Sequence, residues 1–212
     1  MSADGEGRPA DPRARSFGAA AREYERFRPG YPDAAVGFAL GDAGGAGSRV
    51  LDLGAGTGKL TASLLARGLS VTAVEPDPEM LAVLRGRFPG LDAVPGAAER
   101  IPLPDGSVDA VVAGQAVHWF DPERSAAEIV RVLRPGGTFA GLWNGADGEI
   151  GWIAGLDEVR TGSPAPVDNP AGGGEGPGLP GAPWFTGHTG RVLRWTRPTT
   201  TEDYLANQRT HS

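Results

Sequence analysis

Hydrophobic and polar positions follow two alternating patterns through the middle of the chain. Short apolar runs rich in valine, leucine and alanine are typical of buried strands, and they occur at residues 50–53, 71–75, 91–94, 108–113 and 138–143. Apolar residues at helical spacing fill three of the intervals, at residues 58–67, 77–88 and 126–133. Strands that alternate with helices in this way indicate βαβ units. We therefore predict an α/β fold built on a Rossmann-like, doubly wound and mostly parallel sheet.

Two of the helices carry the same start signal. Asp77-Pro78-Glu79 and Asp121-Pro122-Glu123 each supply an N-cap carboxylate, a proline at the first helical position and an acid in the first turn. Arg134–Gly137, which reads RPGG, ends the second of these helices before the last strand.

The chain before the first strand is predicted to be helical after a short tail. Residues 1–15 are small, charged and proline-containing, so we expect a mobile tail. Helical spacing over residues 17–27, a break at Pro29–Pro32 and a second helix at 33–40 predict an N-terminal helical segment. With this segment, the main domain spans residues 16–145.

The pattern weakens after the main domain. We predict a short helix at 151–160, a long flexible loop at 161–183, a strand at 192–195 and a helix that begins near residue 201. Residues 146–212 are therefore interpreted as a glycine- and proline-rich loop with an incomplete C-terminal cover on the substrate side.

Charge and composition narrow the function. The 212 residues suit one α/β domain with a modest appendage. With 20 basic against 26 acidic residues the net charge is -6, the wrong sign for following a phosphate backbone, so we expect no nucleic-acid partner. No run of 18 apolar residues and no secretory signal is present, so we expect no membrane association and a cytoplasmic location. The absence of cysteine and the scatter of His118, His188 and His211 argue against a metal site.

The segment Asp52–Gly58, which reads DLGAGTG, places three glycines where the first strand turns into a helix. Glycines at such a turn let a ligand approach the backbone closely. A phosphate-binding P-loop would need glycine in place of Leu53 and serine or threonine in place of Leu60. A dinucleotide fingerprint would need glycine in place of Lys59, which weakens the case for a nicotinamide-dependent oxidoreductase.

Three alternating glycines after an acidic strand end suit a ligand that carries no pyrophosphate, and S-adenosylmethionine is such a ligand. Glu75 ends the second strand 17 residues beyond Gly58. A carboxylate there, at the carboxyl edge of the sheet, can accept hydrogen bonds from both hydroxyls of a ribose.

Together these features resemble the class I S-adenosylmethionine-dependent methyltransferases, especially the ubiquinone-biosynthesis and trans-aconitate methyltransferase-like branch (methyltransferase type 11). The similar stretches, from about residue 16 to 145, are Phe17–Pro32, Val50–Gly58, Val74–Pro76, Gly96–Glu99, Gly114–Phe120 and Arg131–Gly137. The resemblance implies S-adenosylmethionine as the cofactor and transfer of its methyl group to a small-molecule acceptor.

The resemblance also implies a role for each matching position. The cofactor's methionyl end is assigned to Asp52, Gly54, Ala55, Gly56 and Gly58, its ribose to Glu75 and Pro76, its adenine rim to Ala97, Ala98 and Glu99, and the floor beside the sulfonium to Gln115–Trp119. Closure of the pocket is assigned to Tyr24, Arg28 and Tyr31, and the substrate pocket to Tyr31, Trp119 and Asn144.

Several of these residues also have a plain structural interpretation. Asp52 could cap the loop, Glu75 could be a solvated strand end, and Glu99 could be a turn residue. Trp119 and Phe120 are apolar enough for the core, although they follow the fourth strand at the edge where open α/β sheets bind ligands.

Methyl transfer from a sulfonium needs an in-line nucleophile, so positioning and water exclusion should dominate catalysis. If the acceptor is a hydroxyl, His118 is the hypothesised general base, and lining of the pocket is the other interpretation. The alternative function is a protein that binds S-adenosylmethionine without transferring methyl.

The resemblance is weakest at the C-terminus. Relatives generally continue past residues 199–212 with more helix and the last antiparallel strands, so we expect a short or truncated substrate cover. An uncovered sheet edge leaves backbone groups unpaired, and a homodimer is one way to pair them.

Overall fold

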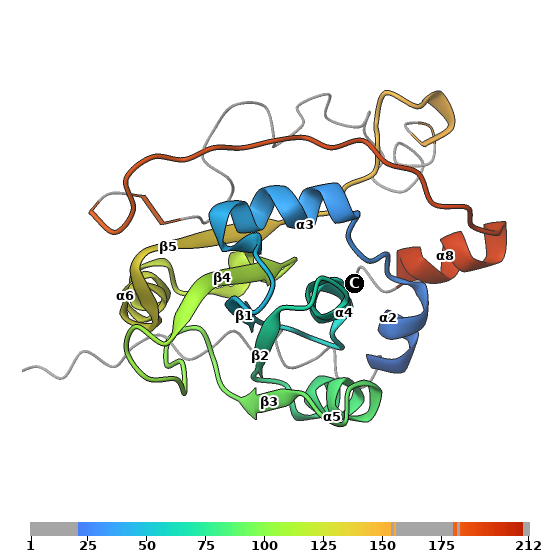
Figure 1. Ribbon diagram of the computed structural model, residues 1–212. Helices are drawn as coiled ribbons and strands as arrows, with labels where there is room; N and C mark the ends of the chain where they lie inside the picture. The colour runs from blue at the N-terminus through green and yellow to red at the C-terminus, as the bar shows by residue number, and fades with distance from the viewer. Residues whose placement is uncertain (1–20, 154, 156–179, 182, 210–212) are drawn as a thin grey trace, which may run out of the picture.

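Five parallel strands form one sheet, in the order β3-β2-β1-β4-β5 (Figure 1). The computed structural model describes residues 21–153, 155, 180–181 and 183–209. The strands are β1 (Arg49–Leu53), β2 (Ser70–Glu75), β3 (Asp92–Pro95), β4 (Val108–Gly114) and β5 (Leu133–Leu142). The chain adds β2 and β3 on one side of β1 and then β4 and β5 on the other, as a doubly wound sheet does. The predicted Rossmann-like α/β fold is thus confirmed.

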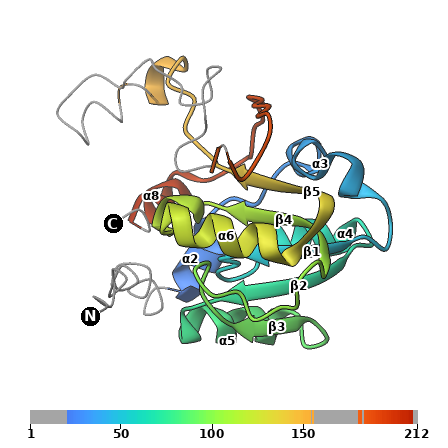
Figure 2. The ribbon, with the colours of Figure 1, turned by 90° about the vertical axis from the view of Figure 1, so that its left-hand side faces the viewer.

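Helices lie on both faces of this sheet (Figures 1 and 2). Their bounds are α2 (Ala21–Phe27), α3 (Asp33–Leu40), α4 (Lys59–Ala66), α5 (Pro78–Arg87), α6 (Pro122–Val132) and α8 (Thr201–Arg209). Two short 3-10 helices that the pattern did not predict are η2 (Gly41–Gly44) and η3 (Val117–Trp119). None of the described helices combines the length and the apolar character that crossing a bilayer requires.

Alternate residues of the strands point to opposite faces and build two main hydrophobic clusters. On one face, Val50 of β1 packs in a cluster with Leu40 of α3 and Leu64 of α4. On the other face, Leu51 packs in a cluster with Ile129 of α6. Burial of each such side chain stabilises the fold by about 1.5–3 kcal/mol, so the sheet and these helices form a rigid frame.

The predicted helix starts are confirmed by their capping geometry. Asp77 Oδ1 accepts from the backbone N–H groups of Glu79 and Met80, at 2.9 and 3.0 Å. Asp121 Oδ1 accepts from Arg124 N at 3.1 Å. Proline follows each cap at the start of α5 and α6, as its missing N–H and fixed φ favour.

Two predicted strands differ from the structure. β5 begins at Leu133 instead of residue 138, because Leu133 pairs with Val108 and the register then shifts before Ala110 pairs with Thr138. The predicted strand at 192–195 is wrong, since residues 188–200 have no regular secondary structure. Alternating apolar residues make a strand only where a neighbouring backbone completes a ladder. The helix predicted from residue 201 is confirmed as α8.

Some predictions fall outside the described residues. The tail at 1–15 lies there entirely, as do residues 161–179 of the predicted loop. Of the helix predicted at 151–160, residues 151–153 and 155 are helical and the others are not described.

Gly58, at the start of α4, provides a test of how the fold depends on close packing against α5. Its φ is +87°, and a Cβ there would overlap Leu84 Cδ1 of α5. Gly68 has a similar φ of +73° but open space around the same position. Gly68→Ala should therefore carry only the left-handed backbone cost of about 1–2 kcal/mol.

We predict that Gly58→Ala lowers the free energy of unfolding by about 1–3 kcal/mol more than Gly68→Ala, because it adds overpacking to the same backbone cost. Urea unfolding of both variants measures the difference. Equal losses would show that α5 does not press on this glycine.

Candidate functional site

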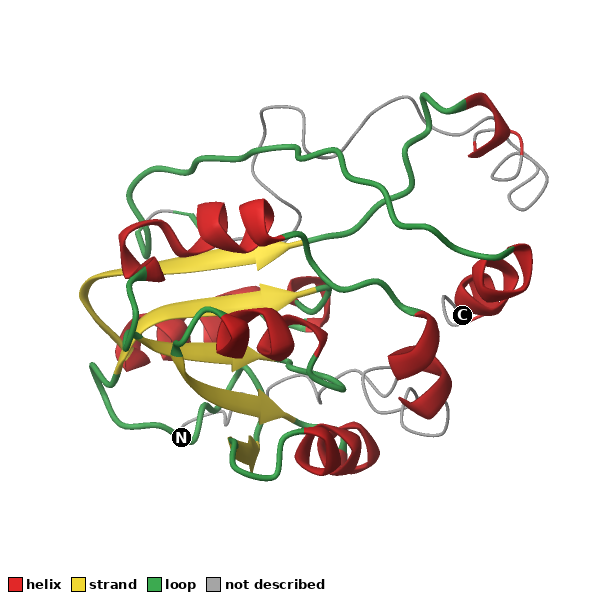
Figure 3. Cartoon of the chain, turned by 45° about the vertical axis from the view of Figure 1, so that its right-hand side comes forward, coloured by secondary structure: helices red, strands yellow, loops and turns green. Residues whose placement is uncertain are grey.

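The carboxyl ends of β1, β2 and β4 meet at one edge of the sheet, where the strand arrows of Figure 3 point. β1 is followed by the glycine loop (Gly54–Gly58), β2 ends at Glu75, and β4 leads through Gln115 into η3. Open parallel sheets bind ligands at this edge, so the topology brings the predicted residues to the expected place.

The three glycines of the loop all adopt left-handed backbone conformations, with φ of +70°, +58° and +87°. Gly54 and Gly58 are crowded by protein, since a Cβ at Gly54 would lie 2.7 Å from Ala116 Cβ and one at Gly58 would overlap α5. Gly56 differs, because its nearest such contact is Met80 Sδ at 3.7 Å. The middle of the loop therefore has the room that a ligand needs beside the backbone.

Glu75 joins this loop to the next turn. Its side chain is buried, Oε2 accepts from Gly56 N at 2.7 Å, and Oε1 accepts from Asp77 N at 2.8 Å. Burial raises the pKa of Glu75 to about 7, although the two backbone N–H groups lower it. Each carboxylate oxygen has a second lone pair, so Glu75 can still accept from a ligand hydroxyl.

Asp52 is a buried acid with one unused oxygen. Its Oδ2 accepts from Thr61 Oγ1 at 2.6 Å, whereas its Oδ1 has no hydrogen-bond partner in the part of the chain that is described. The residue is 1% exposed, and burial raises its pKa to about 6. A buried acceptor without a donor is costly, and a cationic or donor group on a ligand would satisfy it.

The end of β4 is strained and tied to its neighbours. Among the described residues, Gln115 is the one non-glycine with a positive φ, +56°. Its Nε2 donates to Asn144 O at 2.9 Å, and Asn144 Nδ2 donates to Gly30 O at 3.0 Å. Tyr31 packs so closely on this edge that a Cβ at Gly114 would lie 2.5 Å from its hydroxyl. The structure thus brings the predicted residues Gln115, Asn144 and Tyr31 together.

Tyr24 and Arg28 lie on and just after α2. The Arg28 guanidinium carbon lies 5.1 Å from the centre of the Tyr24 ring. Burial raises the pKa of Tyr24, and the Glu75 and Glu25 charges add to this rise while Arg28 opposes it. Arg28 N also donates to Tyr24 O at 3.0 Å, so these two predicted residues are in contact.

The adenine-rim residues have structural contacts of their own. Ala98 is buried in the cluster beneath α6. Glu99 Oε1 accepts from Asp121 N at 2.8 Å and so closes the start of α6. Pro76 is half-buried between β2 and α5. These residues follow the carboxyl ends of β2 and β3. The contact of Glu99 with the start of α6 was not evident from the sequence.

His118 and Trp119 lie on η3. Their rings are 4.7 Å apart, with His118 exposed and Trp119 half-buried. Partial desolvation lowers the pKa of His118, so its imidazole is neutral at pH 7 and able to accept a proton.

Sequence reasoning missed a polar cluster centred on Glu25 of α2. Its Oε2 accepts from Thr57 Oγ1 at 2.6 Å and from Arg87 Nη1 at 2.9 Å, and its Oε1 lies 3.0 Å from Lys59 Nζ. The partners lie 32 to 62 residues away along the chain, and no local spacing signals such contacts.

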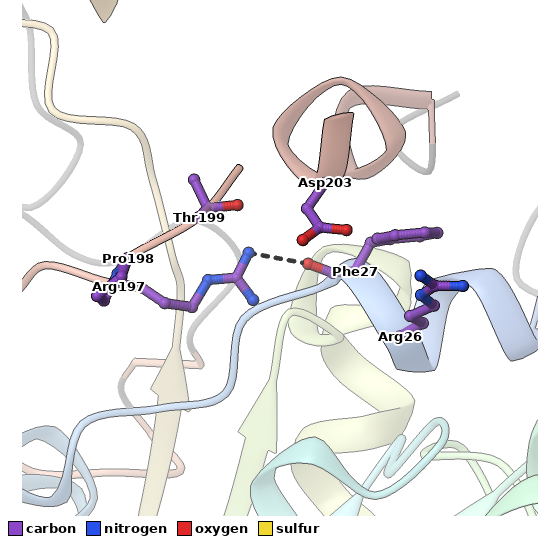
Figure 4. A pocket seen from close by; sticks show the side chains of 6 residues that line it. All are labelled: Arg26, Phe27, Arg197, Pro198, Thr199 and Asp203. Atoms are coloured by element: carbon purple, nitrogen blue, oxygen red, sulfur yellow. Dashed lines mark hydrogen bonds between the residues drawn. The ribbon is translucent and has the colours of Figure 1, made fainter. Parts of the chain in front are cut away.

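A separate pocket of about 210 Å³ lies between α2 and α8 (Figure 4). Arg197 Nη2 donates to Phe27 O across it, at 3.1 Å. Its lining residues are Arg26, Phe27, Arg197, Pro198, Thr199 and Asp203. None of the predicted cofactor residues belongs to this set.

Comparisons with known proteins agree with the geometry. A family model described as a methyltransferase domain matches residues 51–141. An uncharacterized methyltransferase of Mycobacterium tuberculosis is 54% identical over 151 residues, which are 70% of this chain and 61% of the relative. An uncharacterized methyltransferase of Schizosaccharomyces pombe is 42% identical over 145 residues, 66% of this chain and 56% of the relative. The chain therefore spans about three-fifths of the length of these curated relatives.

Solved structures extend the match. The structure of a candidate type II methyltransferase from Anaeromyxobacter dehalogenans is 37% identical, with a TM-score of 0.55 over 64% of this chain and 57% of that one. A candidate S-adenosylmethionine-dependent methyltransferase from Methanococcus maripaludis, at 17% identity and a TM-score of 0.54 over 76% of each chain, shares the fold. Residues 51–141 thus match a methyltransferase domain, and the chain shares the fold of an S-adenosylmethionine-dependent methyltransferase.

Proposed function

We propose that this protein transfers the methyl group of S-adenosylmethionine to a small-molecule acceptor. The observation that carries the proposal is the pairing of an open backbone position at Gly56 with two buried acids, Asp52 and Glu75, at the edge where parallel sheets bind ligands. The cofactor, when bound, supplies a methyl group already activated by its positive sulfur.

The residues present fit this cofactor. The unused Oδ1 of Asp52 suits the methionyl ammonium group, and the free lone pairs of Glu75 suit the ribose hydroxyls. Ala98 and Glu99 would border the adenine, and Gln115 the reacting end. Net charge of -6 supports a small molecule over nucleic acid as the acceptor.

Catalysis at such a site rests on positioning and water exclusion. Tyr24 and Arg28 would cover the cofactor side, while Tyr31, Trp119 and Asn144 would border the acceptor. Asn144 is well placed to position both the cofactor and the acceptor, because it links Gln115 at the end of β4 to Gly30 in the N-terminal segment.

Cofactor binding is tested by calorimetry with S-adenosylhomocysteine. We expect the wild type to bind it, and Glu75→Ala to bind about 10-fold to 100-fold more weakly, because hydrogen bonds to a buried carboxylate are lost. Gly56→Val should weaken binding as well by filling the loop. Glu79→Ala, an exposed acid four residues further on, is the matched control and should bind normally. Normal affinity in Glu75→Ala and Gly56→Val, or tight binding of NAD(P) instead, would refute the proposed site.

Asp52 predicts a pH dependence of stability without ligand. Its pKa in the folded state, about 6, lies above its usual value of 3.8, so the folded form holds the proton more tightly. The resulting stabilisation is complete below 3.8 and is lost as pH rises through about 6. Between pH 5 and pH 8 the wild type should lose about 1.4 kcal/mol through this group.

Asp52→Asn removes the titration while keeping an oxygen to accept from Thr61. Relative to the wild type, this variant should therefore gain about 1.4 kcal/mol of unfolding free energy on going from pH 5 to pH 8. Urea unfolding at both pH values measures it. A difference that does not change with pH would mean that Asp52 is ionised normally in the fold.

The role of His118 is tested by turnover. With a hydroxyl or phenol acceptor, His118→Ala should reduce kcat about 10²-fold to 10⁴-fold, because a general base contributes that much, while affinity for S-adenosylhomocysteine stays unchanged. Formation of S-adenosylhomocysteine with a panel of small acceptors provides the assay. His188→Ala, which replaces another exposed histidine, is the control. Near-full turnover in His118→Ala would refute the general-base role and favour a role in lining the pocket.

A further inference from the structure

The helix α2 has one buried apolar residue, Ala21, and several polar contacts to the domain. None of its described side chains belongs to the hydrophobic clusters that bind α3, α4, α5 and α6 to the sheet. Arg197 donates to its Phe27 carbonyl, and three further contacts to the domain converge on one side chain, Glu25. A segment held by few apolar contacts opens more readily than the core does.

Glu25 binds three separate elements at once. Thr57 belongs to the glycine loop, Lys59 is the first residue of α4, and Arg87 is the last residue of α5. Lys59 Nζ also donates to the backbone oxygen of Glu25. The Glu25 side chain is 21% exposed, so these charge-assisted contacts are shielded from most solvent.

The same contacts reach the cofactor loop directly. Thr57 stands between Gly56 and Gly58, and Arg87 Nη1 also donates to the Thr57 carbonyl at 2.5 Å. The neighbouring Gly56 N is held by Glu75. The loop is therefore clamped from two sides, by Glu75 of the sheet and by Glu25 of α2.

From this arrangement we propose that α2 is a latch on the cofactor site and that Glu25 is the positioning residue that fastens it. While Glu25 holds Thr57, Lys59 and Arg87, α2 stays against the glycine loop and carries Tyr24 with it. When these contacts break, α2 loses its ties to the glycine loop, α4 and α5, and the cofactor side opens. The inference rests on the proposed function, since it assigns the residence time of the cofactor to a residue outside the binding loop.

The experiment measures release of S-adenosylhomocysteine by stopped-flow displacement from the full chain. Glu25→Gln keeps the size of the side chain but removes its charge, and should raise the dissociation rate at least about tenfold, with the association rate changed less. Glu23→Gln, an exposed acid on the same helix, is the matched control and should release ligand like the wild type.

Three further measurements separate a latch from a general loss of stability. Hydrogen exchange without ligand should show faster exchange in α2 of Glu25→Gln, with β1 and β4 unchanged. The effects of Glu25→Gln and Arg87→Gln on the dissociation rate should be less than additive in the double variant. Each substitution alone already breaks the ion pair between Glu25 and Arg87. Higher salt should speed release from the wild type more than from Glu25→Gln, because it screens these partly exposed charges.

The outcomes are distinct. If the wild type binds S-adenosylhomocysteine and Glu25→Gln releases it at the same rate, or if Glu23→Gln shows an equal change, the latch is refuted while the proposed function stands. If the wild type does not bind the ligand at all, the proposed function fails and the latch fails with it.

Discussion

The hydrogen bond from Gly56 N to Glu75 Oε2 is the interaction on which the site depends. Glu75 is the last residue of β2. Its other oxygen accepts from the backbone N–H of Asp77, the N-cap of α5. One carboxylate thus fixes the distance between the loop after β1 and the turn after β2. The hydrophobic clusters position β1 and β2. The Glu75 carboxylate then holds the two loops that follow these strands at a fixed separation, and the proposed ligand site lies between them.

Burying such acids opposes stability. The pKa of Glu75 is raised to about 7 and that of Asp52 to about 6, both chiefly by burial. At neutral pH the site therefore carries ionised or partly ionised acids that prefer water. Proteins accept local conflicts of this kind at functional sites, where a ligand supplies the missing partners. The unused oxygen of Asp52 is one example, because it is buried and has no donor among the described residues.

The sequence predicted those parts of the fold that follow from local chemistry. Asp77 and Asp121 start helices because cap, proline and acid act within one turn, and the structure shows the capping bonds. The mostly parallel sheet and the place of Glu75 at its carboxyl edge followed from the alternation of strands and helices. The strand at 192–195 failed for the converse reason, since its formation depends on a neighbour that local pattern does not specify. Arg194 in this segment pairs instead with Asp147 and Glu149.

Within the candidate site, the sequence likewise predicted residues placed by local position but not contacts made by tertiary packing. The loop glycines and Glu75 stand next to strand ends, so position along the chain indicated their place. The contacts of Glu25 depend on how α2 packs over a loop and two helices, and no rule of spacing links residue 25 to residues 57, 59 and 87.

The two halves of the site are therefore held by different forces. Apolar burial fixes the sheet, α4 and α5, and with them the floor under the ligand. Charged and polar contacts of Glu25 tie α2, the proposed cover, to the glycine loop, α4 and α5. Hydrophobic burial is insensitive to modest salt, whereas partly exposed ion pairs are screened by it. On the proposed function, a cover held in this way can open to admit and release the cofactor while the frame stays folded.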